Sequence, residues 1–212
     1  ADDAERHQDV VAEAASRGVD VLYLSDKAVT KLSEATTTPG IFAVCDLLDA
    51  DLVEVLAAKP RLLAVAVEAR EPGNVGTIIR CADAMGADAV VLLGDSVDPH
   101  NGKCVRSSAG SVFHLPIVRE RSITDGLNRI RAAGITTLAT AADGELSLDD
   151  AGEVLARPTA WLLGNEAHGL SDEVLIAADH RVSIPIRGRA ESINIAAAAA
   201  ICLYESARVQ NR

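Results

Sequence analysis

Residues 184–194, with the sequence IPIRGRAESIN, run directly into an apolar segment, IAAAAAICLY, at residues 195–204. The isoleucines around the proline predict the end of a buried strand, the glycine predicts a turn, and Ser192 or Asn194 is placed to cap a long helix. That helix is apolar on nearly every side, which is typical of helices buried in a core or against a second chain. Polar groups and backbone amides therefore gather where the strand ends and the helix begins.

The composition is that of a globular protein with one or two domains. The chain has 212 residues, of which 49% are hydrophobic and 24% are charged, which is enough to bury a substantial core. Its longest apolar run is well below the roughly 18 residues that a membrane span needs, and no signal-peptide pattern opens the sequence, so we expect a cytoplasmic protein. The cysteines show no CxxC pair or metal-ligand spacing and are expected to be reduced and buried: Cys45, Cys81, Cys104 and Cys202.

The net charge of -11 argues against broad non-specific binding to nucleic acid, because such binding relies on Lys and Arg side chains that release counterions. An RNA partner would have to meet a local basic patch. Each candidate cation has an equally simple interpretation as a solvated surface charge. The candidates are Arg80, Lys103, Arg106, Arg119, Arg121, Arg187 and Arg189.

Residues 1–48 have the pattern of a small, incomplete α/β domain. Two short strands and two helices make a marginal core on their own, so the segment is either a small accessory domain or part of a larger one. A helical linker is expected over residues 49–60. The predicted helices are 1–17 and 26–32, and the predicted strands are 19–24 and 41–44.

From residue 61 to residue 212, short apolar runs alternate with helical patterns. This alternation predicts a mostly parallel sheet with helices on both faces. Ligands of such sheets bind outside the carboxyl ends of the strands. The predicted strands are 62–67, 89–93, 115–118, 135–139, 159–163 and 182–186, and the predicted helices are 75–85, 102–111, 123–133, 171–178 and 194–209.

Two further turns at strand ends carry unusual residues. In the first, EAREPGNVGTIIR at residues 68–80, Asn74 opens a helix along which Arg80 can reach a phosphate as a fork-shaped donor. The alternative is an asparagine helix cap followed by a surface arginine. Neither GxGxxG nor GxxxxGK[ST] is present, so a dinucleotide site and a P-loop lose their main support.

The second turn, GNEAHG at residues 164–169, again follows a buried strand. Glu166 can orient an arginine or accept a hydrogen bond from a ligand, or it can simply cap the helix that follows. His168 is a candidate base, although a lone histidine in a loop is more often a surface residue.

Together the motifs N-x-G-x-x-x-R at 74–80, G-N-E-x-x-G at 164–169 and I-P-I-x-G-x-x-x-S-x-N at 184–194 resemble those of the SpoU or TrmH family of RNA ribose 2'-O-methyltransferases, in the SPOUT superfamily. The segment VRSSAGS at 105–111 also looks like the family's intervening stretch. The chain is similar to the thiostrepton-resistance type of 23S rRNA methyltransferase. The resemblance covers about residues 61–208 and rests on three motifs in the family's order.

The resemblance implies a parallel sheet whose C-terminal segment is threaded into a deep trefoil knot, and a homodimer formed through the knot region. It also implies S-adenosylmethionine as cofactor, bound against the turns that follow three strands. By carry-over, the residues expected to line that pocket are Thr140, Leu163, Gly164, Glu166, Ile184, Ile186, Ser192, Ile193 and Asn194.

The resemblance further implies that Arg80 is the catalytic arginine, supported by Asn74 and Glu166, with Ser192 and Asn194 fixing the cofactor and the target nucleotide. Arginine is a poor literal base because its pKa lies above about 12, so we favour a phosphate clamp that also stabilises the developing alkoxide. No metal is needed. The expected RNA contacts are Arg80, Lys103, Arg106, Arg187 and Arg189.

In this family a small domain resembling a ribosomal large-subunit protein often precedes the catalytic domain and binds RNA. Residues 1–46 look like its latter half, with the opening strand and helix missing. Such a domain favours ribosomal RNA, most simply 23S rRNA, over transfer RNA as the substrate. A tRNA 2'-O-methyltransferase, a non-catalytic RNA-binding or ribosome-assembly protein with the same fold, and a different doubly wound nucleotide binder remain as alternatives.

Overall fold

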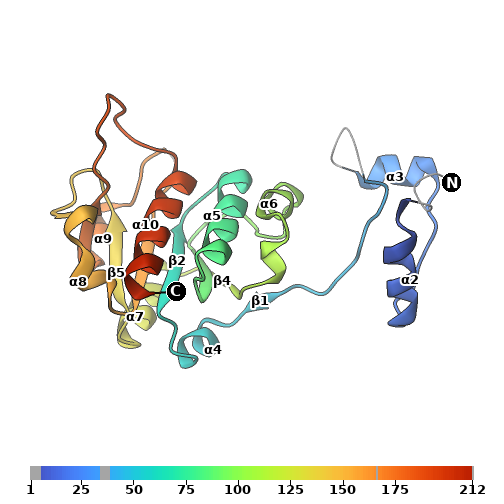
Figure 1. The fold of residues 1–212 in the computed structure, drawn as a ribbon, viewed down its shortest axis with the longest axis horizontal. Coiled ribbons are helices and arrows are strands. Elements are labelled where there is room, and N and C mark those ends of the chain that lie inside the picture. Colours follow the sequence, from blue (N-terminus) through green and yellow to red (C-terminus); the bar gives the residue numbers. More distant parts are fainter. Residues whose placement is uncertain (1–5, 34–38, 166, 212) are drawn as a thin grey trace. The chain divides into compact units, whose positions relative to one another are not determined.

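The structure, a computed structural model, describes residues 6–33, 39–165 and 167–211 (Figure 1). The chain divides into two compact units, Ala1–Asp46 and Leu47–Arg212. The second unit contains the whole alternating pattern of strands and helices, including its first elements, β1 and α4.

One parallel sheet forms the centre of the second unit. In the described part of the chain it has eight strands in the order β1-β4-β3-β2-β7-β5-β8-β6, and each neighbouring pair is parallel. The mostly parallel α/β fold expected from the sequence is therefore confirmed. The strands are β1 Asp49–Ala50, β2 Leu62–Val67, β3 Ala89–Leu93, β4 Ile117–Glu120, β5 Thr136–Thr140, β6 Leu146–Ser147, β7 Thr159–Leu163 and β8 His180–Ser183.

Helices cover both faces of the sheet, and the central strands β2 and β3 are accordingly apolar at every position. In β2, Leu62, Ala64 and Ala66 join one buried cluster and the three residues between them join the other, as expected of a strand covered on two sides. The helices on the first face are α5 Pro72–Ala84, α6 Gly102–Ser108, α8 Gly152–Leu155 and α10 Ile195–Gln210, and those on the second face are α4 Leu52–Ala57, α7 Ile123–Ala132 and α9 Asp172–Ala177; two short 3-10 helices are η1 Ser111–Phe113 and η2 Leu148–Asp150.

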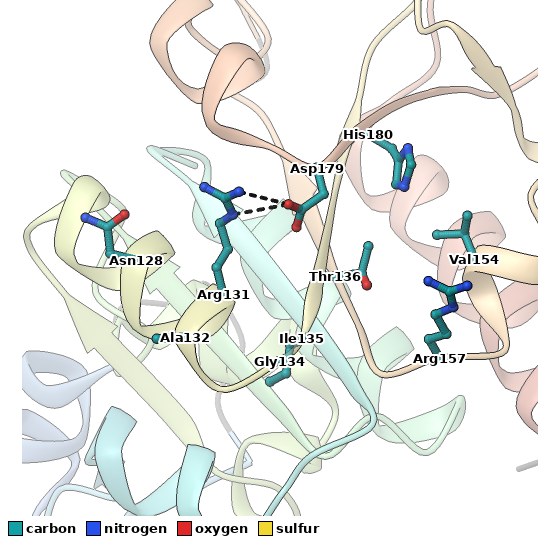
Figure 2. A pocket seen from close by; sticks show the side chains of 10 residues that line it. All are labelled: Asn128, Arg131, Ala132, Gly134, Ile135, Thr136, Val154, Arg157, Asp179 and His180. Carbon is teal, nitrogen blue, oxygen red and sulfur yellow. Dashed lines mark hydrogen bonds and ion pairs between the residues drawn. The ribbon is translucent and has the colours of Figure 1, made fainter.

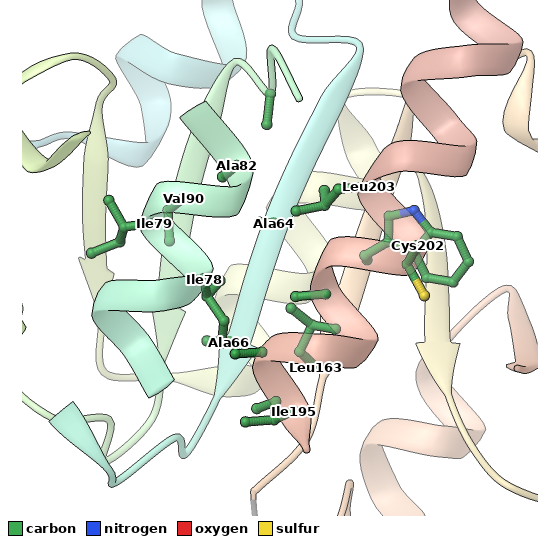
Figure 3. Close-up of a cluster of buried hydrophobic side chains, with 14 of the residues drawn as sticks. Ala64, Ala66, Ile78, Ile79, Ala82, Val90, Leu163, Ile195, Cys202 and Leu203 are labelled. Carbon is green, nitrogen blue, oxygen red and sulfur yellow. The ribbon is translucent and has the colours of Figure 1, made fainter. Parts of the chain in front are cut away.

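The C-terminal helix α10 packs directly on the middle of the sheet. Figure 3 shows α5 and α10 side by side over β2, with Ile78 of α5 and Leu203 and Cys202 of α10 in the shared core. Inside this layer the Trp161 indole Nε1 donates a 2.8 Å hydrogen bond to the Ser206 hydroxyl, so its one polar group is satisfied in the interior. The core therefore fixes where α10 begins, beside the carboxyl edge of the sheet.

Several element boundaries differ from those expected from the sequence. The strand predicted at 182–186 begins at His180 and ends at Ser183, because it pairs with β5 in the register Leu138↔His180 and because Pro185 lacks an N–H for a ladder. The helix predicted from residue 49 begins only at Leu52, since Asp49–Ala50 pairs with β4 instead. The helix predicted at 102–111 ends at Ser108, after which Ala109 and Gly110 adopt left-handed backbone with φ of 50° and 96°.

The strands predicted in the first unit are wrong. Residues 19–24 and 41–44 form no strand, and the described part of this unit contains only the helices α2 Gln8–Ser16 and α3 Asp26–Leu32. A strand is stable only when a neighbour completes its hydrogen-bond ladder, and neither segment pairs with any other segment that the structure describes. The side chains of Leu22, Tyr23 and Val44 are accordingly exposed.

The expectation that all four cysteines are buried is confirmed for only two of them. Cys104 and Cys202 are buried, but Cys81 is half-buried and Cys45, in the first unit, is exposed. All four are free thiols.

No helix among the described residues combines the length and hydrophobicity needed to cross a membrane.

Candidate active site

The three motif turns follow β2, β7 and β8, and residue Thr140 ends β5 between the last two. These four strands are consecutive neighbours in the sheet. Since the strands are parallel, their carboxyl ends lie at one edge. The fold therefore brings together residues that are separated by more than a hundred positions in the sequence.

The first turn begins with a residue in strained backbone conformation and ends with a carboxylate that caps α5. Glu68, directly after β2, has a left-handed φ of 50°, which costs free energy for a residue with a side chain. Glu71, not Asn74, caps α5: its Oε1 accepts from the Gly73 N–H at 3.3 Å, with Pro72 in the first turn. Asn74 therefore lies within the first turn of α5, and the alternative that it serves as the helix cap is wrong.

Gly76, the glycine of the first motif, allows two helices to pack closely where they cross. A Cβ on Gly76 would lie 2.0 Å from the Ser107 hydroxyl and 2.3 Å from the carbonyl oxygen of Cys104, both on α6. Only glycine lets α5 and α6 approach this closely. The segment at 105–111 is thus packed against the helix that carries Asn74 and Arg80.

The second turn is held to the first by Asn165. Its side-chain Nδ2 donates to the carbonyl oxygen of Glu68 at 2.8 Å, and its Oδ1 accepts from the Ala167 N–H at 2.8 Å. A Cβ on Gly164 would lie 2.4 Å from the backbone of Gly169 and Leu170, so the turn closes tightly on itself. Residue Glu166, a predicted catalytic and cofactor residue, lies outside the described residues.

The third turn, residues 184–194, contains no helix or strand and ends at Asn194. As predicted, Asn194 caps α10: its Oδ1 accepts from the N–H groups of Ala196 at 2.8 Å and Ala197 at 3.4 Å. Its Nδ2 donates to the Asn74 Oδ1 at 3.0 Å. This hydrogen bond joins the first motif directly to the third.

The residues predicted to line a cofactor pocket differ in what they expose. Leu163 is fully buried in the core, so only its backbone can face a ligand, and the Thr140 hydroxyl donates to the carbonyl oxygen of Leu162 at 3.0 Å. Ile184 is half-buried. The side chains of Ile186 and Ile193 are 39% and 37% exposed. Exposed isoleucines on an otherwise polar loop suit an apolar ring of a ligand. Ser192 is exposed near them.

The predicted RNA-contacting cations fall into two groups. Lys103 forms an ion pair with Glu71, and Arg187 donates to Asp149 at 2.7 Å. The pairing with Lys103, together with the Gly73 N–H, lowers the pKa of the Glu71 carboxyl. By contrast, Arg80 and Arg189 are exposed, and the described residues offer them no hydrogen-bond or ion-pair partner. Arg106 is exposed too, but it is not without a partner.

The remaining basic candidates are similarly divided. Arg119 lies 3.5 Å from Asp49 and 3.6 Å from Asp98, and Arg121 is exposed. His168 is exposed as well, as its surface interpretation predicted. Within the described ranges, no three His, Cys, Asp or Glu side chains come together as metal ligands.

Sequence reasoning assigned no role to two residues that hold these turns. Asn165 ties the second turn to the first, and Asp149 receives Arg187 of the third. The position of Asn165 between Gly164 and Glu166, directly after a buried strand, was an available signal. Asp149 had none, because its proximity to Arg187 depends on the tertiary fold.

Comparison with known proteins places these features in one family. The model of the SpoU rRNA Methylase family matches residues 61–204. The chain is 37% identical over 187 residues to the 23S rRNA (guanosine(2553)-2'-O)-methyltransferase RlmP of Bacillus subtilis, covering 88% of this chain and 72% of that protein. It is 38% identical to the 23S rRNA (uridine(2479)-2'-O)-methyltransferase of Streptomyces viridochromogenes, covering 80% of this chain and 60% of the relative's length.

A solved structure agrees over nearly the whole chain. It is the AdoMet-bound rRNA methyltransferase from Sinorhizobium meliloti, with a TM-score of 0.84 and 32% identity, covering 96% of this chain and 77% of that one. The family match includes all three motif turns and the hydrogen-bonded pair of asparagines. The chain therefore belongs to the SpoU rRNA methylase family.

Proposed function

We propose that the protein transfers a methyl group from S-adenosylmethionine to a ribose 2'-hydroxyl in RNA, most simply in 23S ribosomal RNA. The observation that carries the proposal is the hydrogen bond between Asn74 and Asn194 at the common edge of four parallel strands. It joins two motifs of the family, and the second motif is tied to the same edge by Asn165. The two relatives described above are named as ribose 2'-O-methyltransferases of 23S rRNA.

The described residues fit a methyl donor of this kind. The third turn offers exposed backbone together with the apolar side chains of Ile186 and Ile193. The tight closure at Gly164 leaves backbone amides and carbonyls, rather than side chains, at the end of β7. An adenosine needs apolar contact for its base and hydrogen-bond partners for its polar edge. We propose that Thr140, Leu163, Gly164, Glu166, Ile184, Ile186, Ser192, Ile193 and Asn194 form this site, with Leu163 contributing its backbone.

S-adenosylmethionine supplies an electrophilic methyl group on a positively charged sulfur. The chain's task is to align the ribose oxygen with that methyl group and to help a very weak acid lose its proton. Alignment alone can supply several kcal/mol of the barrier, up to roughly 7 to 11 in well-oriented systems. Asn74 is fixed by Asn194, so its position is set before the RNA arrives.

We assign Arg80 to the RNA side of the reaction. It is exposed, it makes no ion pair among the described residues, and it lies about 9 Å beyond Asn74 along α5. Its guanidinium cannot act as a base at neutral pH. It can donate two hydrogen bonds to one phosphate and stabilise negative charge that develops on the ribose oxygen. Ser192 and Glu166 complete the proposed set around the target nucleotide.

We also propose that the C-terminal segment is threaded as a trefoil knot. Two observations support it. The turn after β5 crosses closely over β8, since a Cβ on Gly144 would lie 2.7 Å from the backbone of Val182 and Ser183. After β8 the chain returns through the third turn to place α10 on β2 and β7. An experimental structure in which residues 184–211 do not pass through the preceding loop would contradict this topology.

A homodimer through α10 is proposed from the outer face of that helix. A groove of about 690 Å³ runs along it, and its lining combines Met85, Leu148, Ile201 and Tyr204 with the acidic residues Asp149 and Glu205. Ile201 and Tyr204 are 41% and 57% exposed, although the opposite face of α10 is buried in the core. Contiguous exposed apolar side chains of this kind mark interaction surfaces.

The first unit is proposed to help bind RNA, and ribosomal RNA is favoured because both relatives described above act on it by name. The tRNA, non-catalytic and nucleotide-binding alternatives are separated by experiment. Wild-type protein is titrated calorimetrically with S-adenosylmethionine and then assayed for methyl transfer to unmodified 23S rRNA and to tRNA. Binding with transfer to 23S rRNA alone is expected.

Two variants locate the proposed site. Asn194→Asp keeps the capping oxygen of α10 but removes the N–H group that reaches Asn74, whereas Asn194→Ala removes both and also costs about 1 kcal/mol of helix capping. Both variants are expected to lose methyl transfer, and circular dichroism reports whether each remains folded. No binding of S-adenosylmethionine by folded wild-type protein, or full activity in Asn194→Asp, would contradict the assignment.

A further inference from the structure

A surface depression of about 640 Å³ lies at the opposite edge of the sheet from the motif turns (Figure 2). Thr136 and His180 line it where β5 and β8 begin, Asn128 and Arg131 come from the end of α7, and Arg157 follows α8. Strands of four and five residues are about 13 to 17 Å long. A ligand held here is therefore not the one that reacts at the carboxyl edge.

The one acidic residue in the lining, Asp179, is already fully engaged. It accepts hydrogen bonds from the Arg131 guanidinium at 3.0 and 3.2 Å and from the Thr137 N–H and hydroxyl at 2.9 and 2.8 Å. Burial alone would raise the pKa of the Asp179 carboxyl, but these hydrogen bonds and the charge of Arg131 hold it below its usual range. Asp179 is thus ionised at neutral pH, and the positive charge of Arg131 neutralises it.

The other polar groups of the lining remain available. Among the described residues, Arg157 has no carboxylate within ion-pair distance, and neither the His180 ring nor the Asn128 amide has a hydrogen-bond partner. Figure 2 shows Arg157 and His180 on the same side of the depression, away from the Arg131–Asp179 pair. Arg131 has its orientation fixed by Asp179 through two of its five N–H groups, so the remaining three can serve another acceptor.

We propose that this depression binds a phosphate group. Arg131 and Arg157 carry forked N–H donors, His180 and Asn128 add further donors, and one positive charge is left over after the pair with Asp179. Phosphate oxygens are the acceptors that such donors match best. The volume exceeds that of one phosphate and admits the attached sugar as well. The occupant is either a phosphodiester of bound RNA or a free phosphate compound, and the site does not depend on the proposed methyl transfer.

The test compares Arg157→Gln with Arg129→Gln. Each variant removes one positive charge, but Arg129 pairs with Glu120 at 3.7 Å and does not line the depression. Amide NMR spectra are recorded with inorganic phosphate and with chloride at equal ionic strength. The salt dependence of 23S rRNA binding is measured for the same proteins by fluorescence anisotropy. Calorimetry with S-adenosylmethionine in each variant reports separately on the proposed methyl-donor site.

We expect phosphate to shift the amide signals of Thr136 and His180 in the wild type and in Arg129→Gln but not in Arg157→Gln. If RNA is the occupant, Arg157→Gln also lowers the slope of log affinity against log salt by about one, as loss of one phosphate contact does. An unchanged slope with intact phosphate shifts identifies a free phosphate compound. No phosphate-specific shift in the wild type, together with an unchanged slope in Arg157→Gln, would overturn the proposal and leave Arg157 as a solvated surface charge.

Discussion

At the scale of single residues, the candidate site depends on two asparagines 120 positions apart. Asn194 performs two tasks with one amide: its oxygen caps α10, and its nitrogen donates to Asn74. The cap fixes the direction of the amide, so the donor is aimed by the helix itself. Serine or aspartate can cap a helix equally well, but neither offers the N–H group. The two tasks together explain why an asparagine stands at this position.

Arg80 supplies a prediction at the same scale. Arg80→Lys keeps the positive charge but loses the two-pronged geometry of the guanidinium, so binding of S-adenosylmethionine should be unchanged while single-turnover methyl transfer falls roughly 100-fold or more. Arg129→Lys, on α7, is the matched control and should retain full activity. Equal transfer rates for the wild type and Arg80→Lys would remove Arg80 from the catalytic set.

At the scale of elements, the first motif depends on how closely α5 and α6 cross. Gly76→Ala would force its Cβ against Ser107 and the carbonyl of Cys104, and overpacking of this kind typically costs about 1 to 3 kcal/mol. We expect a lower free energy of unfolding in urea. Gly188→Ala has no atom within 4 Å of its Cβ and should stay within about 0.5 kcal/mol of the wild type. Similar losses in both variants would argue against the close crossing.

The tie between α7 and the start of β8 predicts a pH dependence. The pKa of Asp179 is lowered in the folded protein, so its stabilising contribution is present above its unfolded pKa and is lost as the pH falls through the lowered value. Asp179→Asn should therefore cost about 1 to 3 kcal/mol at neutral pH, with a gap to the wild type that shrinks below about pH 4. Asp95→Asn, an exposed control, should show no such change. A gap that is constant down to acid unfolding would contradict this account.

Element prediction from the sequence succeeded where the residues themselves decide the structure. β2 is apolar at every position, β7 is apolar after its first residue, and both are buried on both faces; Asn194 caps α10 as its position suggested. Prediction failed where the structure of a segment depends on pairing with another segment. β8 begins at His180 because β5 sets its register, and residues 19–24 have strand composition but pair with no strand in the described part of the chain. High strand propensity alone does not stabilise a strand that lacks a hydrogen-bonded neighbour.

For the candidate site, the sequence predicted the edge of the sheet at which it lies but not the contacts within it. The βα alternation visible in the sequence predicts parallel strands, and the carboxyl ends of such strands share one edge, which is where Asn74, Gly164 and Asn194 were expected. The hydrogen bond between the two asparagines and the pairing of Arg187 with Asp149 were not predictable, since each joins segments that only the tertiary fold brings together. Lys103 likewise turned out to be paired with Glu71 rather than standing alone.

At the scale of the whole molecule, the proposed dimer makes a prediction about α10. Ile201→Asp replaces an exposed apolar side chain of the groove with a charge and should weaken self-association roughly 100-fold or more, because the carboxylate would lose its water on association. Light scattering coupled to size-exclusion chromatography reports the mass. The matched control is Ile176→Asp on α9, where the side chain is 83% exposed. A wild-type monomer would contradict the proposed dimer, and equal dissociation in both variants would place the interface elsewhere.

The central claim is methyl transfer to a ribose 2'-hydroxyl, and the chemistry of the product tests it most directly. Wild-type protein and unmodified 23S rRNA are incubated with S-adenosylmethionine that carries a labelled methyl group, and the RNA is then hydrolysed in alkali. A 2'-O-methyl group removes the hydroxyl that attacks the neighbouring phosphodiester, so the account predicts label in alkali-resistant dinucleotides. Label confined to mononucleotides would mean methylation of a base, and that result would contradict the ribose assignment.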